Sequence, residues 1–262
     1  MISKQDKSVF ISSCRLLLEA YRTGEIGNVV MPEDSNPGFS EDENEQRLVY
    51  FTLPMALNYQ RDSYNLWNSV LATWSDAETR DIFDIHNSAT LYEDQLRTKL
   101  LKYKIALQPN KHVATWNRLS QTVDSNWGSL SALFQEVDND YLRLRDVIQG
   151  THKKDFPYLS GPKIFNYWSF IISTYGKIDL KNRQFIEIAP DTHVTKCSVK
   201  LGLITAEEAS RLSKVELATK WRVILEGVGI EPIDMHPPLW FWSKNNFSYE
   251  LSRDTEINPA NN

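Results

Sequence analysis

Cysteine is scarce in this chain of 262 residues, which has only two, Cys14 and Cys197. Two cysteines can build neither a disulfide framework nor a four-cysteine iron–sulfur cluster within the chain. Long apolar runs are also absent, and none approaches the roughly 20 residues that a membrane-spanning helix needs. The first residues lack the apolar core and the cleavage site of a signal peptide. These absences predict a cytoplasmic protein that does not enter a membrane.

The sequence also lacks the motifs that hold metals and cofactors. Its five histidines show no paired spacing of the kind that binds a metal ion. It contains no phosphate loop of the form GxxxxGK followed by Ser or Thr, no GxGxxG dinucleotide fingerprint and no GxSxG nucleophile elbow. We therefore expect neither a metal nor a cofactor.

The net charge of −5 is unevenly distributed along the chain. Residues 151–230 contain 12 Lys and Arg against 8 Asp and Glu, whereas residues 32–46 contain six acids and no basic residue. Because nucleic-acid binding responds to local charge, a basic face on an acidic body can still hold phosphates. The overall acidity therefore does not exclude a nucleic-acid partner.

Apolar residues recur at helical spacing through most of the chain, and strand signals are weak, which predicts an all-α fold. We expect a single domain over residues 1–251, built from two interleaved helical lobes with a cleft between them, and a disordered polar tail, 252–262. The predicted helices cover 8–22, 48–74 with a break near 61–63, 90–105, 117–134 with a turn at Gly128, and 138–149. Residues 31–46, 179–189 and 232–238 are expected to be loops.

Three positions have the residues that start helices. Ser75 and Thr205 are each followed three residues later by a glutamate, which is the spacing of a capping box. The helix after Thr205 is expected to run to about Glu226. Asp191 follows a proline and precedes a helical stretch that Gly202 ends, so it is predicted to be an N-cap.

A tight apolar turn, Phe156-Pro-Tyr-Leu-Ser-Gly-Pro-Lys163, lies between two predicted helices. A glycine in such a turn lets the backbone approach a phosphate, and the first amides of the next helix point at that phosphate. Lys163 falls in the first turn of this helix. In a dry cleft, the positive end of the helix dipole favours the neutral amine, which is the nucleophilic form.

Asp191 suits a complementary role. Amides around a helix cap favour an ionised carboxylate. An ionised carboxylate close to a cationic sugar transition state stabilises that state electrostatically. Lys163 and Asp191 together are therefore the candidate catalytic pair.

Three segments resemble the signature of the helix-hairpin-helix DNA glycosylase superfamily: Tyr158-Leu-Ser-Gly-Pro-Lys163, Pro190-Asp-Thr-His-Val194 and Lys200-Leu-Gly-Leu203. Two weaker matches, Ala56-Leu-Asn-Tyr-Gln60 and Trp240-Phe-Trp242, resemble the archaeal-type 8-oxoguanine glycosylase branch. The resemblance implies a helix-hairpin-helix motif near 138–175, with the hairpin lysine as amine nucleophile and the aspartate as an essential residue.

The resemblance also suggests roles for residues outside the catalytic pair. A flipped base is held between aromatic rings and by hydrogen bonds to its edges. The candidates for binding such a base are Gln60, Tyr167, Asp234, Trp240 and Trp242. In an extended segment, Trp240 and Trp242 would point the same way.

Leu159 and Gly161 are candidates for binding DNA phosphate, although Leu159 stands where the family usually has glycine. Each candidate also has an ordinary structural interpretation, such as a cap, a surface residue or core packing. His193 is expected to be a structural partner and Cys197 a core residue.

The expected function is that of a monomeric DNA glycosylase and AP lyase, nucleoid-associated if the source is prokaryotic. It would excise a modified purine, 8-oxoguanine, from double-stranded DNA by base flipping and Schiff-base chemistry. Two alternatives are an N-glycosidase acting on another modified base or a nucleotide, and a DNA-binding module without catalytic activity.

Overall fold

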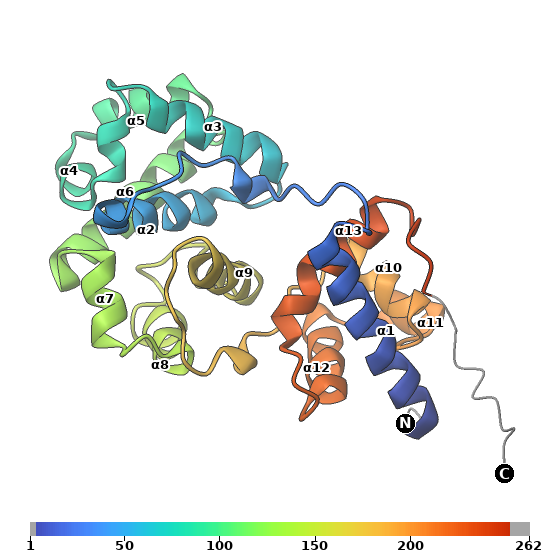
Figure 1. The fold of residues 1–262 in the computed structure, drawn as a ribbon. Coiled ribbons are helices and arrows are strands. Elements are labelled where there is room, and N and C mark those ends of the chain that lie inside the picture. The colour runs from blue at the N-terminus through green and yellow to red at the C-terminus, as the bar shows by residue number, and fades with distance from the viewer. Residues whose placement is uncertain (1–3, 252–262) are drawn as a thin grey trace, which may run out of the picture. The chain divides into compact units, whose positions relative to one another are not determined.

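The computed structural model describes residues 4–251 and consists of helices, which confirms the all-α expectation. Thirteen α-helices and no β-strand occur in this range. They form two compact units (Figure 1): a middle unit, Val30–Ile186, and a terminal unit that combines Met1–Val29 with Glu187–Asn262. The predicted disordered tail, 252–262, lies outside the described residues.

Eight α-helices make up the middle unit. They are α2 (Asn44–Thr52), α3 (Ser63–Ser75), α4 (Ile85–Thr90), α5 (Glu93–Lys102), α6 (Pro109–Trp127), α7 (Leu130–Glu136), α8 (Tyr141–Arg145) and α9 (Pro162–Thr174). Short 3-10 turns lie at Pro32–Asp34, Glu41–Glu43, Pro54–Leu57, Arg80–Phe83 and Arg183–Phe185, and a π-helical turn, Asp146–Thr151, continues α8.

Helix α9 carries much of the apolar core of the middle unit. It begins at Pro162, a residue suited to the first position of a helix because its missing N–H would have no partner there. It packs on α2, and Trp168 on its buried face donates from Nε1 to Thr52 Oγ1 at 3.1 Å. The chain leaves the helix at Gly176, where a Cβ atom would lie only 2.6 Å from the carbonyl oxygen of Ile172.

The terminal unit has five α-helices. They are α1 (Lys4–Thr23), α10 (Thr192–Lys200), α11 (Ala206–Arg211), α12 (Lys214–Leu225) and α13 (His236–Lys244). α13 packs against both α1 and α10. Trp221 is fully buried and donates from Nε1 to Ser198 Oγ at 2.9 Å. Cys197 is also fully buried, as expected, and its thiol lies 3.0 Å from the carbonyl oxygen of Leu239.

One of the two predicted capping boxes is present. Thr205 N donates to Glu208 Oε2 at 2.9 Å, and Glu208 N donates to Thr205 Oγ1 at 3.1 Å. The predicted box at Ser75 is wrong, because Ser75 is the last residue of α3 and its hydroxyl donates back into that helix. Asp76 instead accepts from the amide of Glu78 at 2.9 Å and turns the chain.

The helix predicted from Thr205 to about Glu226 is two helices. α11 ends at Arg211, and a second capping box begins α12. In that box Ser213 N donates to Glu216 Oε2 at 2.8 Å, and Glu216 N donates to Ser213 Oγ at 3.2 Å.

The loop predicted over 232–238 is also wrong. Pro232–Met235 forms a 3-10 turn, and α13 begins at His236 with Pro237 and Pro238 in its first turn. Prolines are tolerated there because the first amides of a helix have no intrahelical acceptor.

None of the helices within residues 4–251 combines the length and the apolar character needed to cross a lipid bilayer.

Replacing Trp168 with alanine should lower the free energy of unfolding of the middle unit by about 3–5 kcal/mol, because the lost side chain leaves a cavity in the core. Trp168→Phe should cost less, since it keeps a ring at the site. Denaturant unfolding measures both changes. Tyr92→Ala is the control, because Tyr92 is 80% exposed. If Trp168→Ala lowers the free energy of unfolding no more than this control does, Trp168 is not a core residue of the middle unit.

Candidate active site

The turn before α9 is closed by hydrogen bonds. Ser160 N donates to Phe156 O at 2.9 Å, and Gln149 Nε2 donates to Ser160 O at 3.0 Å. Tyr158 adopts a left-handed conformation with φ 61°. A Cβ atom on Gly161 would lie 3.1 Å from the carbonyl oxygen of Tyr158, so the tight turn favours glycine there.

The amides of Leu159 and Gly161 are already used inside this turn. Leu159 N donates to Pro157 O at 2.8 Å, and Gly161 N donates to Tyr158 O at 3.0 Å. The Leu159 side chain is fully buried. The structure therefore does not support the predicted phosphate contacts through these two amides.

The amides that α9 leaves without an intrahelical acceptor are instead those of Lys163 and Ile164. Pro162 has no N–H, and an α-helix leaves its first amides unpaired along its own backbone. Gly161 occupies the N-cap position and has no side chain to accept from them. An anion at this helix start would meet two backbone donors.

Lys163 is exposed at the second position of α9. Within residues 4–251 its ammonium forms no hydrogen bond or ion pair. No hydrogen bond or ion pair of the described chain therefore holds the side chain in place.

Gln60 lies in the loop between Pro54–Leu57 and α3. It is exposed and has a left-handed conformation with φ 51°. The ring of the preceding Tyr59 lies 5.8 Å from the ring of Tyr158, centroid to centroid. This contact, which the sequence analysis did not anticipate, brings the loop of Gln60 beside the turn that leads to Lys163.

Tyr167 is half-buried and reaches a carboxylate that the sequence analysis missed. Its hydroxyl lies 3.2 Å from both Oε1 and Oε2 of Glu33, and Trp67 Nε1 donates to Glu33 Oε1 at 2.8 Å. Glu33 is fully buried. Burial raises the pKa of the Glu33 carboxyl to about 7, although hydrogen bonds from the backbone, Trp67 and Tyr167 oppose the rise.

Asp191 is the N-cap of α10, as predicted. Its Oδ1 accepts a hydrogen bond from Val194 N at 2.9 Å, and its backbone carbonyl accepts from Thr195 Oγ1 at 2.6 Å. The side chain is partly exposed. Oδ2 accepts no hydrogen bond from the part of the chain that the structure describes.

The first turn of α10 lies against α13 through His193. Its Nδ1 is 3.0 Å from Ser243 Oγ, and its ring lies 5.4 Å from the ring of Trp240. The Lys244 ammonium lies 4.5 Å from the centroid of the Trp240 ring. The structure thus brings Trp240, which is half-exposed, close to the helix that Asp191 caps.

Trp240 and Trp242 do not point the same way, because the segment is helical rather than extended. Two residues of an α-helix that are two positions apart lie about 200° apart around its axis. Trp242 is buried, and its Nε1 donates to Tyr249 O at 2.8 Å. It is therefore a core residue. Asp234 lies half-buried in the 3-10 turn before α13.

The candidate residues belong to two units. The middle unit contains Gln60, Leu159, Gly161, Lys163 and Tyr167. The terminal unit contains Asp191, Asp234, Trp240 and Trp242.

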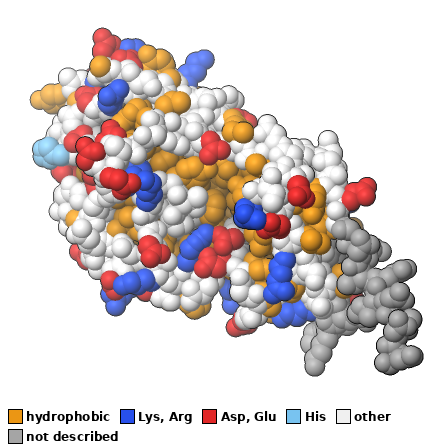
Figure 2. All heavy atoms as spheres, in the orientation of Figure 1, with side chains coloured by type: hydrophobic (Ala, Val, Ile, Leu, Met, Phe, Trp, Pro, Cys, Tyr) orange, Lys and Arg blue, Asp and Glu red, His pale blue; other side chains and the backbone are white. Residues whose placement is uncertain are grey.

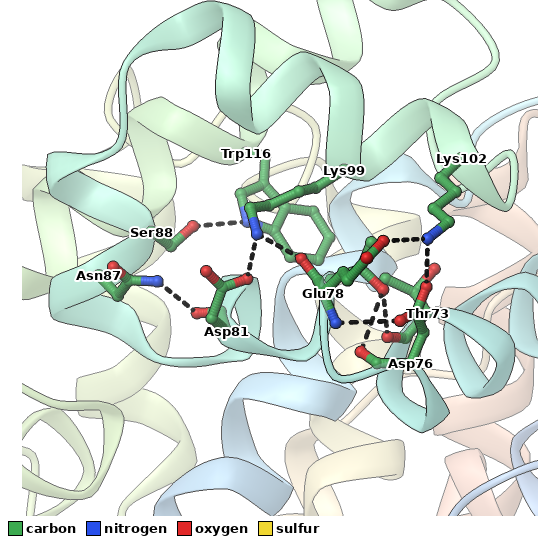
Figure 3. A network of polar contacts seen from close by, with 10 residues as sticks. Thr73, Asp76, Glu78, Asp81, Asn87, Ser88, Lys99, Lys102 and Trp116 are labelled. Atoms are coloured by element: carbon green, nitrogen blue, oxygen red, sulfur yellow. Dashed lines mark hydrogen bonds and ion pairs between the residues drawn. The ribbon is translucent and has the colours of Figure 1, made fainter.

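A shallow depression of about 410 Å³ lies elsewhere in the middle unit, along α5. Its lysines are paired with acids, as Figure 3 shows: Lys102 Nζ lies 2.7 Å from both Asp76 Oδ2 and Glu78 Oε2, and Lys99 Nζ lies 2.9 Å from Asp81 Oδ1. None of the candidate residues lines it. We therefore interpret the ion pairs at this depression as structural.

The charges of the surface are mixed. Lys and Arg side chains lie among Asp and Glu on the face drawn in Figure 2 and do not gather into one basic area there. Among residues 4–251, no group of three or more His, Cys, Asp or Glu side chains is arranged to hold a metal ion.

No protein-family model matches this chain, and no curated protein matches it either. A functional proposal therefore has to rest on the residues themselves.

Proposed function

We propose that this chain is a DNA glycosylase and AP lyase that excises a modified purine, 8-oxoguanine, from a nucleotide flipped out of double-stranded DNA, and that it acts as a monomer. The observation that carries the proposal is the position of Lys163. It is an exposed amine without an ion-pair partner in the described chain, on a helix start whose amides lack a side-chain cap. A DNA phosphate is an anion that suits such a helix start.

The proposed reaction begins at the Lys163 amine. Its nitrogen forms a bond to the anomeric carbon of the flipped nucleotide while the bond from that carbon to the base breaks. The base leaves with the electron pair and takes up a proton. Loss of a proton from nitrogen and opening of the sugar ring then give a Schiff base, and β-elimination breaks the bond to the 3′ phosphate.

Asp191 would supply negative charge to this reaction. Its Oδ1 is held by the α10 amide, and Oδ2 is left to act on a cationic sugar. A fixed carboxylate stabilises a developing positive charge without reorganising during the step.

Gln60, Tyr167, Asp234 and Trp240 would bind the base. Gln60 has both a donor and an acceptor for a Watson–Crick edge, and Trp240 offers a half-exposed ring for stacking. Trp242 has no part in this proposal, because it is buried.

A smaller substrate, such as a nucleotide that carries a modified base, is the second candidate. The amides of Leu159 and Gly161 are occupied, and the face in Figure 2 has mixed charges. Both observations favour a ligand with few phosphates over a long duplex.

Lys163→Gln should abolish the covalent protein–DNA adduct that borohydride traps during turnover on an 8-oxoguanine duplex, because the amide cannot form a Schiff base. Lys154→Gln is the matched control, since this exposed lysine lies two residues before the turn and its loss changes the net charge equally. Denaturing gels measure the adduct. Base release at the full rate by Lys163→Gln without an adduct would show that Lys163 is not the nucleophile.

Asp191→Asn should keep the stability of α10 within a few tenths of a kcal/mol, because asparagine caps a helix about as well as aspartate. It should nevertheless lower base excision by orders of magnitude, because the charge is gone. Asp84→Asn, at the N-cap of α4, is the control for the cap alone. Thermal melting and single-turnover excision separate the two roles, and normal excision by Asp191→Asn would leave the residue a cap only.

Gln60→Ala and Trp240→Ala should both slow excision while the circular dichroism spectrum stays unchanged. A lost hydrogen bond that leaves a buried base atom unpaired costs roughly 1–3 kcal/mol, and a lost base–aromatic stack costs roughly 1–3 kcal/mol. Gln121→Ala, an exposed glutamine of α6, is the control for the amide. Unchanged excision in both variants would place the base pocket elsewhere.

A further inference from the structure

Glu33 is a fully buried carboxylate that the proposed mechanism does not use. It lies in the 3-10 turn Pro32–Asp34 of the middle unit. No Lys or Arg of the described chain forms an ion pair with it. Besides the backbone at Glu33 itself, its carboxyl has Trp67 and Tyr167 as hydrogen-bond partners. A buried carboxylate without a cation is costly to keep, so its position calls for a role.

Tyr167 connects this buried group to the helix of Lys163. It stands four residues after Lys163, and residues at this spacing lie on the same face of a helix. The phenol is half-buried, and its ring stacks on Phe170 at a centroid distance of 6.1 Å. The hydroxyl reaches inward to both oxygens of Glu33.

The protonation state of Glu33 determines which way the hydrogen bond from Tyr167 runs. The indole N–H of Trp67 can only donate, so it always takes one carboxyl oxygen as acceptor. When Glu33 is ionised, Tyr167 also donates to it, and the phenol oxygen keeps its lone pairs for other donors. When Glu33 is protonated, its O–H needs an acceptor, and the Tyr167 oxygen is in reach. The phenol then directs its own hydrogen elsewhere.

The groups around Glu33 allow both states near neutral pH. Asp34 is the neighbouring charge and raises the pKa of Glu33 further, although less than burial does. Three tyrosines also bond to the backbone or side chains of this segment: Tyr50 of α2 donates to Ser35 O, Tyr64 of α3 donates to Val30 O, and Tyr175, just after α9, donates to Asp34 Oδ1.

We propose that Glu33 is a positioning residue that acts through Tyr167 and makes the phenol oxygen a hydrogen-bond acceptor for the base. The proposal rests on the proposed function. 8-Oxoguanine has an N7 hydrogen where guanine has an acceptor, so an acceptor in the pocket favours the modified base. Ionised Glu33 thus selects 8-oxoguanine, and protonated Glu33 weakens that selection.

The test measures the single-turnover rate of 8-oxoguanine excision from pH 5.5 to 8.5. The wild type should lose roughly tenfold in rate as Glu33 takes up its proton, which is the loss of about one hydrogen bond. Glu33→Gln should show the slow rate at every pH, since its amide donates to Tyr167 as the protonated acid does. Tyr167→Phe should also lose this pH dependence. Tyr175→Phe is the matched control, because it removes a tyrosine–aspartate hydrogen bond next to the same helix, and it should keep the wild-type profile.

A second readout does not need activity. The resonance of the Trp67 indole N–H should shift with a midpoint near pH 7 in the wild type and should stay constant in Glu33→Gln. In Tyr167→Phe it should shift at a higher pH, because this variant lacks one donor to the ionised carboxylate.

The pKa of the Glu33 carboxyl is higher in the folded than in the unfolded protein. The stability that Glu33 contributes is therefore complete below pH 4.5 and is lost as the pH rises through about 7. Glu33→Gln should therefore unfold without this pH-dependent loss.

The two readouts separate the possible failures. A resonance that does not titrate, or a Glu33→Gln profile equal to the wild type, overturns the role of Glu33 while excision stands. A normal titration without excision at any pH overturns the proposed function, and with it the effect on base selection, but leaves the coupling between Glu33 and Tyr167 established.

Discussion

The start of a helix leaves backbone amides that need acceptors, and this constraint shapes both candidate catalytic positions. α10 meets the need with Asp191, whose carboxylate accepts from Val194. α9 has Gly161 at the same position and no side chain to meet it. α3, α4, α7, α8, α11 and α12 are capped by a Ser, Thr or Asp side chain. No side chain caps the starts of α2, α5, α6, α9 and α13, and Lys163 lies in the first turn of α9. In the proposed function this start of α9 holds a DNA phosphate.

Local signals in the sequence predicted the parts of the fold that are decided within a few residues. The cap at Asp191, the capping box at Thr205 and the left-handed glycine that ends α6 depend on neighbours along the chain. The same kind of signal failed where another neighbour competed. After Ser75 the chain turns because Asp76 accepts a hydrogen bond from the Glu78 amide. Ser213 caps a new helix, α12, within a stretch that was predicted to be one continuous helix.

The contacts that matter most to the candidate site could not be found in this way, because they join distant segments. Glu33 and Tyr167 are 134 positions apart, and Glu33 stood in an acidic stretch that suggested only a solvated loop. Tyr59 and Tyr158 meet across about a hundred residues. The orientation of Trp242 depended on whether its segment was helical, and two prolines in a helix's first turn made it look like a loop.

Helix α9 combines a buried face, an exposed lysine and a tyrosine that contacts a buried carboxylate. Its buried face, with Phe165 and Trp168, fixes it in the core of the middle unit. Its first turn exposes Lys163, and Tyr167 reaches the Glu33 carboxylate, which forms no ion pair with a Lys or Arg of residues 4–251. A helix that only packed a core would gain nothing from a buried acid, because an apolar side chain of similar size avoids the desolvation of a charge. The position of Glu33 under Tyr167 therefore fits the proposed role of a hydrogen bond whose direction can change.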